Sequence, residues 1–140
     1  MRKDKEVYVF DTTALLAFIE DEEGSEYIEN LLLRAEKEEI IVFIAFISLT
    51  EVFYITIQEK GESEAIRRIK LVKSLAVRTI ESNEELNLMA GKLKATNRIS
   101  LADAYIAAVC KEFDGILVHK DPEFERLTRL IREYRLPYKN

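Results

Sequence analysis

The amino-acid sequence predicts an α/β protein with a mostly parallel central sheet that helices cover on both faces. Short apolar segments alternate with longer segments that have helical periodicity. The apolar segments have little polar interruption, as expected for strands that are buried on both faces. The 140 residues include only four glycines and two prolines, so little of the chain is available for long loops. This length suits one domain over residues 1–140, because two domains would be undersized.

The first third of the chain predicts a strand followed by two helices. Residues 7–10 (VYVF) form a short apolar run that is typical of a buried strand. A helix should begin near Thr12 and end before Gly24, because glycine favours a break. A second helix is expected over residues 25–39, where apolar side chains recur at helical spacing.

The middle of the chain predicts a second buried strand, two further helices and a third strand. Residues 40–46 are continuously apolar and rich in β-branched and aromatic side chains, which favours a strand. A helix over residues 48–60 should end at Gly61, which can adopt the backbone conformation of a C-terminal cap. Another helix is expected over residues 63–73, and a strand over residues 77–80.

The last third predicts two helices, a strand, a final helix and an edge strand. Helices are expected over residues 83–95 and 100–113, the second of them rich in alanine on one side. A strand over residues 116–118 follows. Asp121-Pro122 should then open a helix over residues 121–132, because proline is favoured at the first helical position. Residues 137–138 could add a short edge strand.

Composition excludes several classes of protein. Cys110 is the single cysteine, so no internal disulfide can form, which suits a reducing cytoplasm. With one cysteine and one histidine, there is no Cys/His cluster for zinc. The apolar run over residues 40–49 is shorter than the roughly 20 residues that span a bilayer, so no membrane partner is expected. The net charge of −5 argues against nucleic-acid binding unless divalent cations supply positive charge.

Four acidic residues are placed near strand ends. Asp11 directly follows the first strand and Asp121 closely follows the fourth. Glu51 lies one turn into the helix after the second strand, and Asp103 lies one turn into the helix that begins near Ser100. Ligands of parallel α/β sheets bind beyond the carboxyl ends of the strands, so these acids can meet there. For Asp103 this position is an assumption.

Carboxylates gathered at one edge would suit Mg²⁺, a hard cation that prefers oxygen ligands. The cation lowers the pKa of bound water and stabilises charge on an attacked phosphate. Helix capping is the competing explanation for each acid taken alone. Asp11 and Asp121 each precede a predicted helix, and Ser48 with Glu51, like Ser100 with Asp103, has the spacing of a capping box.

Four segments resemble the motifs of a known family, the PIN domains. These segments are residues 9–17 (VFDTTALLA), 47–52 (ISLTEV), 99–108 (ISLADAYIAA) and 117–124 (LVHKDPEF). Their order and spacing agree with the family over nearly the whole chain, and the third is the most specific. The compact length is similar to that of VapC-type toxins of toxin–antitoxin pairs.

The resemblance implies a three-layer α/β/α fold and cleavage of RNA by a Mg²⁺- or Mn²⁺-dependent endonuclease. It assigns the metal ligands to Asp11, Glu51, Asp103 and Asp121. It also implies a homodimer and inhibition by an antitoxin protein that inserts near the site.

Two residues depart from the family pattern. The family often has threonine or serine at the position of His119, and often aspartate at that of Glu123. His119 could contact a substrate phosphate or pack at the strand end. Glu123 is expected to be a first-turn helix residue rather than a ligand.

Further residues are weaker candidates for substrate binding. Lys94 and Arg98 lead into the third motif, where they could contact RNA, and the hydroxyls of Thr12 and Thr13 could bind a water or a phosphate. The basic stretch over residues 67–73 is expected to be a solvated helix face, although it could also follow RNA phosphates.

Two other functions compete with the nuclease. A PIN fold that has lost catalysis could act as an RNA- or protein-binding adaptor, although all four acids are present. A phosphatase of the haloacid-dehalogenase type would need a second acid at position 13, where this chain has threonine.

Overall fold

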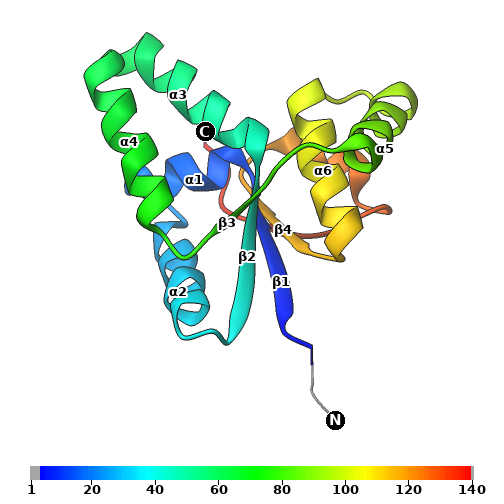
Figure 1. Ribbon diagram of the computed structural model, residues 1–140, viewed down its shortest axis with the longest axis horizontal. Coiled ribbons are helices and arrows are strands. Elements are labelled where there is room, and N and C mark those ends of the chain that lie inside the picture. The colour runs from blue at the N-terminus through cyan, green and yellow to red at the C-terminus, as the bar shows by residue number, and fades with distance from the viewer. Residues whose placement is uncertain (1–3, 140) are drawn as a thin grey trace.

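A single sheet of five parallel strands organises the described part of the chain. The computed structural model describes residues 4–139, and its strand order is β3-β2-β1-β4-β5. The strands are β1 (Glu6–Phe10), β2 (Ile40–Ala45), β3 (Arg78–Ile80), β4 (Ile116–His119) and β5 (Arg132–Arg135). Every pair of neighbours is parallel, which confirms the predicted α/β class with its mostly parallel sheet (Figure 1).

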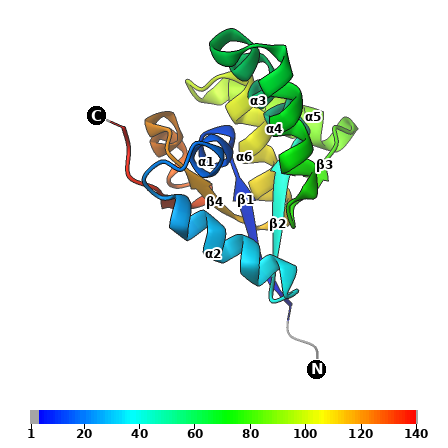
Figure 2. The same cartoon turned by 90° about the vertical axis from the view of Figure 1, so that its left-hand side faces the viewer.

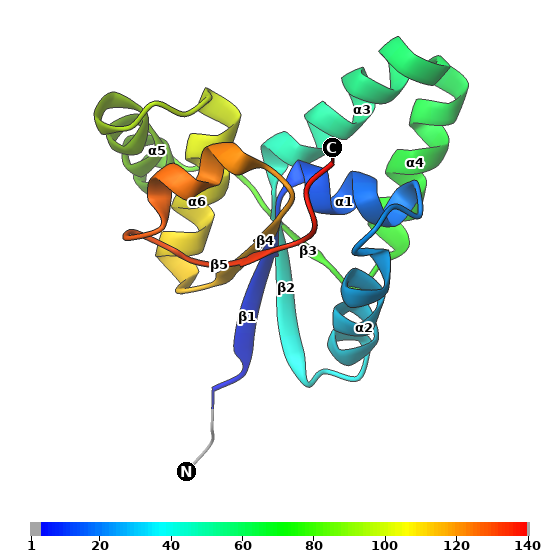
Figure 3. The ribbon, with the colours of Figure 1, turned by 180° about the vertical axis from the view of Figure 1, so that it is seen from behind.

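Helices cover both faces of this sheet. They are α1 (Thr12–Ile19), α2 (Ser25–Glu36), α3 (Phe46–Lys60), α4 (Glu62–Ser74), α5 (Glu84–Thr96), α6 (Leu101–Phe113) and the 3₁₀ helix η1 (Pro122–Leu127). Helices α1, α2 and the α3–α4 hairpin lie on one side, and α5, α6 and η1 lie on the other (Figures 1 and 3). Figure 2 faces the α1–α2 side, with both helices in front of the strands. The expected three-layer α/β/α arrangement is therefore confirmed.

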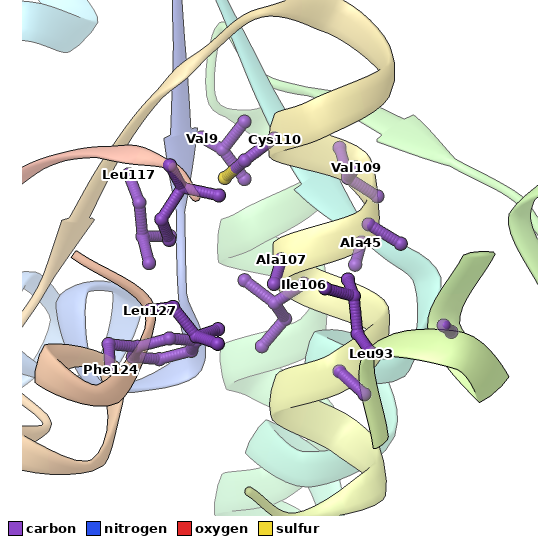
Figure 4. Packing of buried hydrophobic residues seen from close by; sticks show 14 of the residues in the cluster. Val9, Ala45, Leu93, Ile106, Ala107, Val109, Cys110, Leu117, Phe124 and Leu127 are labelled. Carbon is purple, nitrogen blue, oxygen red and sulfur yellow. The ribbon is translucent and has the colours of Figure 1, made fainter. Parts of the chain in front are cut away.

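Alternating side chains of the central strands build two separate cores. Val9 of β1 and Leu117 of β4 belong to the core under α6 and η1, and Figure 4 shows Val9 beside Cys110 of α6. Their neighbours Phe10 and Val118 point to the opposite core under α1 and α2. This alternation follows from the two-residue period of a strand. It explains why the strands read as continuous apolar runs.

Close packing under α6 depends on small residues. The alanines of α6 that face the sheet are fully buried. A Cβ added to Gly115 would lie 2.9 Å from a methyl group of Val9, closer than real Cβ contacts. Helix α6 can therefore lie close to the central strands, which fixes its N-terminus relative to β1.

The C-terminal part of the chain differs from the sequence prediction. In place of a helix over residues 121–132, the structure has the shorter 3₁₀ helix η1 over Pro122–Leu127. The edge strand is β5, four residues that pair with β4 and end before the expected 137–138 segment. Pairing with β5 satisfies backbone N–H and C=O groups on the edge of β4, which a helix over these residues would leave unpaired.

The start of α3 also differs from the prediction. The helix begins at Phe46 rather than at Ser48, and its N-cap residue Ala45 has no capping side chain. Ser48 is therefore buried inside the first turn, so it is not a cap and the capping box with Glu51 does not form. Within residues 4–139, no helix combines the length and the apolarity needed to cross a membrane.

Candidate active site

Three carboxylates gather at the carboxyl edge of the sheet. Asp103, Asp121 and Glu123 each place one oxygen so that the three oxygens lie within 4.8 Å of one another. Asp103 comes from the first turn of α6, and the other two come from the segment after β4. The side chain of Asp103 is buried, whereas those of Asp121 and Glu123 are partly exposed. The N-terminus of α6 therefore lies at this edge, as assumed from the sequence.

Glu123 was not expected to join this group. Its position in the first turn of η1 agrees with the sequence prediction, but its carboxylate faces Asp103 and Asp121. The available signal was the resemblance itself, since the family often has an acid at this position. A short 3₁₀ turn in place of an α-helix sets where the side chain points.

Asp11 is buried next to this cluster and held by short hydrogen bonds. Its carboxylate accepts from the backbone N–H of Ala14 at 2.8 Å and from the Thr13 hydroxyl at 2.8 Å. The Asp11 amide donates to the carbonyl of Val118 at 3.2 Å, which joins the ends of β1 and β4. Burial raises the pKa of Asp11 to about 7, and the charge of Asp121 contributes in the same direction.

Asp103 and Glu123 behave as a pair. Burial raises the pKa of Asp103, and the neighbouring carboxyls of Glu123 and Asp121 raise it further. The pKa of Glu123 is lowered, first by its hydrogen bond with Asp103. Asp103 therefore stays protonated and donates a hydrogen bond to the charged carboxylate of Glu123. This is expected when two carboxyl groups lie close together without a cation.

Glu51 lies outside the group of three but remains at the same edge. Its Oε1 accepts from the Thr12 hydroxyl at 2.6 Å, and Thr12 follows Asp11 directly at the start of α1. The Thr12 hydroxyl also lies 3.2 Å from that of Ser48. These contacts join the first two turns of α3 to the first turn of α1.

Capping accounts for two of the four predicted acids. Asp11 caps α1 through Ala14, and Asp121 caps η1 by accepting from the amide of Glu123 at 2.9 Å. Asp103 is not a cap, because Ser100 caps α6 by accepting from the Asp103 amide at 3.1 Å. Capping and clustering thus coexist in Asp121, since a carboxylate has two oxygens.

Several of the weaker candidates for substrate binding are engaged within the protein. Thr13 is engaged internally, because its hydroxyl donates to Asp11 and accepts from the Lys120 amide at 2.8 Å. Lys94 donates to the carbonyl of Ile99 at 2.8 Å. His119 is fully buried, which favours packing at the strand end over contact with a phosphate.

A groove runs beside the acidic cluster. It has a volume of about 700 Å³ and is bounded by the segment from Lys94 to Ser100 and by Glu123. The exposed side chain of Arg98 lies along it. A basic groove next to the cluster could hold a segment of an anionic polymer.

The donor set fits a hard divalent cation. The clustered groups offer only carboxylate oxygens, which Mg²⁺ and Mn²⁺ accept, and no histidine nitrogen or thiol takes part. Burial, and to a lesser extent the neighbouring carboxylates, raise the pKa values of Asp11 and Asp103, and a bound cation would stabilise their charged forms.

Comparison with known proteins agrees with the fold and the motifs. The family model described as the PIN domain matches residues 8–130. Among proteins with curated functions, no sequence matches significantly.

Several solved structures share the fold at low sequence identity. VapBC2 from Rickettsia felis, bound to a DNA fragment from its promoter, is 19% identical with a TM-score of 0.74, over 94% of this chain and 99% of that one. Mycobacterium tuberculosis VapC20, a sarcin–ricin loop cleaving toxin, is 16% identical with a TM-score of 0.70, over 93% and 99%. VapBC-5 from Mycobacterium tuberculosis, a member of the VapBC family of toxin–antitoxin systems, is 16% identical with a TM-score of 0.62, over 93% and 97%.

These identities are too low to carry function across, but they establish the architecture. The family model spans most of the sequence and includes the segments that hold all four predicted acids. On this ground, the chain belongs to the PIN domain family, as its four motifs predicted.

Proposed function

We propose that this chain is a metal-dependent endoribonuclease that acts as the toxin of a toxin–antitoxin pair. The observation that carries the proposal is the convergence of Asp103, Asp121 and Glu123 beside the buried Asp11. Acids from three distant parts of the chain meet at one edge, although such crowding is unfavourable without a cation. Membership of the PIN domain family supports the same activity.

In this proposal, Asp11, Glu51, Asp103 and Asp121 hold Mg²⁺ or Mn²⁺, and Glu123 joins them. When bound, the cation supplies a water activated near neutral pH and stabilises charge on the attacked phosphate. Thr13 keeps the carboxylate of Asp11 in place through its hydroxyl. The N-terminus of α6 favours anions, so it can help to accept the phosphate of the substrate.

RNA would lie along the groove between Arg98 and Glu123, close to the cluster. The groove, with a volume of about 700 Å³, has room for a nucleotide, and the exposed side chain of Arg98 can pair with a phosphate. The resemblance suggests a homodimer and an antitoxin partner. The fold neighbours that include VapBC complexes support the partner as a proposal.

A catalytically inactive adaptor remains the alternative proposal. An adaptor would need no cation, so it would have no need to keep the full set of acidic residues. The full set of carboxylates is present in this chain, which favours the nuclease.

The activity can be tested with purified chain and a single-stranded RNA. We expect internal cleavage with Mg²⁺ or Mn²⁺ and none with EDTA. Asp103→Asn removes a clustered carboxylate but keeps the size of the side chain, so cleavage should fall by at least roughly 100-fold. Glu112→Gln, on the exposed side of the same helix, is the matched control and should cleave like the unmodified chain.

Circular dichroism of Asp103→Asn should show an intact fold. Full cleavage by this folded variant in Mg²⁺ would show that Asp103 has no role in the reaction. Absence of calorimetric Mn²⁺ binding by the unmodified chain would favour the adaptor.

A further inference from the structure

The only histidine of the chain lies directly behind the acidic cluster. His119 ends β4, and its side chain is fully buried. Its Nδ1 accepts a hydrogen bond from the backbone N–H of Asp121 at 3.1 Å. This bond fixes the backbone at the point where the chain leaves the sheet and presents Asp121 to the cluster.

The hydrogen bond to Asp121 determines where the ring carries its proton. Because Nδ1 accepts, the proton of a neutral ring must be on Nε2. Nε2 faces Oε1 of Glu133 at 3.6 Å, and among the described residues neither Nε2 nor Oε2 of Glu133 has a hydrogen-bond partner. The buried Nε2–H thus faces the Glu133 carboxylate, whose other oxygen is likewise unpaired among these residues, so this carboxylate can serve as its acceptor.

Glu133 is held in this position by the edge strand. Strand β5 pairs with β4 in a register that sets Arg135 opposite His119. The guanidinium of Arg135 donates to Oε1 of Glu133, whose side chain is only 9% exposed. Packing of the His119 ring against Phe124 of η1, with centroids 5.1 Å apart, restricts the ring from the other side.

We propose that Glu133 and His119 form a positioning pair that orients Asp121 from behind and thereby shapes the acidic cluster. The inference rests on the proposed metal site but extends it to β5, which contributes no cluster acid. His119 acts here through the Asp121 backbone and does not touch the substrate. Groups that orient metal ligands in this way typically change metal affinity 10–100-fold when they are removed.

The first test observes the ring itself in the metal-free protein. Because the chain has one histidine, its ¹⁵N NMR signals need no assignment. We expect an unprotonated Nδ1 and a protonated Nε2, retained in Glu133→Gln because the amide oxygen can accept. In Glu133→Leu the acceptor is lost, so the preference for this tautomer should weaken. A proton on Nδ1 in the unmodified chain would overturn the proposal.

The second test measures Mn²⁺ affinity by calorimetry at a temperature where every variant is folded. His119→Leu leaves the Asp121 amide unpaired and should weaken binding roughly tenfold or more. His119→Asn places its amide oxygen where Nδ1 lies, so it should restore most of the affinity. His119→Gln can reach only the Nε2 position and should not. The Asn–Gln comparison decides the matter even if the leucine variant does not fold.

Glu112→Gln serves as the control for the glutamate variants, because it removes an exposed charge on α6 that takes no part in the pair. It should bind Mn²⁺ like the unmodified chain. Equal affinity in all His119 variants would show that the residue only stabilises the fold. If the unmodified chain bound no Mn²⁺, the proposed metal site would fail, whereas the NMR result would still report on the pair.

Discussion

Asp11 shows how one side chain serves both the fold and the site. Its carboxylate caps α1 through Ala14 and is also the most buried acid at the carboxyl edge. Capping alone would favour the charged form, yet burial raises the pKa to about 7. The charged form of Asp11 therefore destabilises the metal-free folded state, whereas a bound cation would stabilise it.

This tension predicts how stability depends on pH. The pKa of Asp11 is about 7 in the folded chain, against 3.8 for an ordinary aspartate such as that of the unfolded chain. Between these pH values the folded chain therefore holds one more proton than the unfolded chain. The contribution of Asp11 to the free energy of unfolding should thus fall as pH rises through this window, by up to roughly 4 kcal/mol, and level off above pH 7. Urea denaturation in EDTA at pH 5 and pH 8 measures the effect.

Asp11→Asn provides the comparison, because it keeps the cap oxygen without a titrating group. The loss of stability between pH 5 and pH 8 should be smaller in this variant, and Mg²⁺ should restore stability to the unmodified chain at pH 8. Identical pH profiles for both proteins would contradict the prediction.

Glu123 is the residue at which sequence and structure differ most within the site. Since its oxygen lies with those of Asp103 and Asp121, Glu123→Gln should lower Mn²⁺ affinity roughly tenfold. Glu112→Gln is the control, because Glu112 is exposed and outside the group. Isothermal titration calorimetry on the two variants distinguishes a ligand from a helix-turn residue. Equal affinities would return Glu123 to a purely local role.

At the scale of elements, the α3–α4 hairpin is joined to α1 by a buried charge. Arg68 of α4 is only 6% exposed, although its basic stretch was expected to form a solvated face. Its guanidinium lies 3.1 Å from Oε1 of Glu20, at the end of α1, and 3.6 Å from Oε2 of Glu64. Glu64 lies one helical turn before Arg68, so this ion pair is local, but the burial of Arg68 was not foreseen.

Removing this contact should destabilise the protein. Arg68→Ala leaves Glu20 without its cation and Glu64 with Arg67 alone, and because both glutamates remain partly exposed we expect a loss of about 2 kcal/mol. Arg67→Ala is the control, since Arg67 is 77% exposed and should change stability by less than about 0.5 kcal/mol. Equal losses in urea denaturation would mean that burial does not determine the effect.

At the scale of the whole molecule, the charge of −5 opposes binding of RNA. The proposed cations would offset most of the negative charge at the cluster, because two divalent ions carry four positive charges against five carboxylates. Affinity for a cleavage-resistant phosphorothioate RNA should therefore rise at least roughly tenfold when Mn²⁺ replaces EDTA. Fluorescence anisotropy measures this change. Asp103→Asn should show a smaller rise, and an equal rise in both proteins would place the cation effect elsewhere.

The sequence by itself determined the α/β class, nearly all strand and helix positions, and the four motifs with their acids. These features depend on local periodicity and on short segments, so they can be read without knowing which segments meet. Asp11 and Asp121 belong to this group, because each follows a strand directly.

Only the tertiary structure decided the features that depend on distant partners. Pairing with β4 makes residues 132–135 a strand, and the ion pair with Glu20 allows the side chain of Arg68 to be buried. Likewise, the place of Glu123 in the cluster and the burial of His119 against Glu133 follow from how the segment after β4 packs on α6 and β5. Such contacts join residues far apart in the chain, so their free energies leave no periodic signal in the sequence.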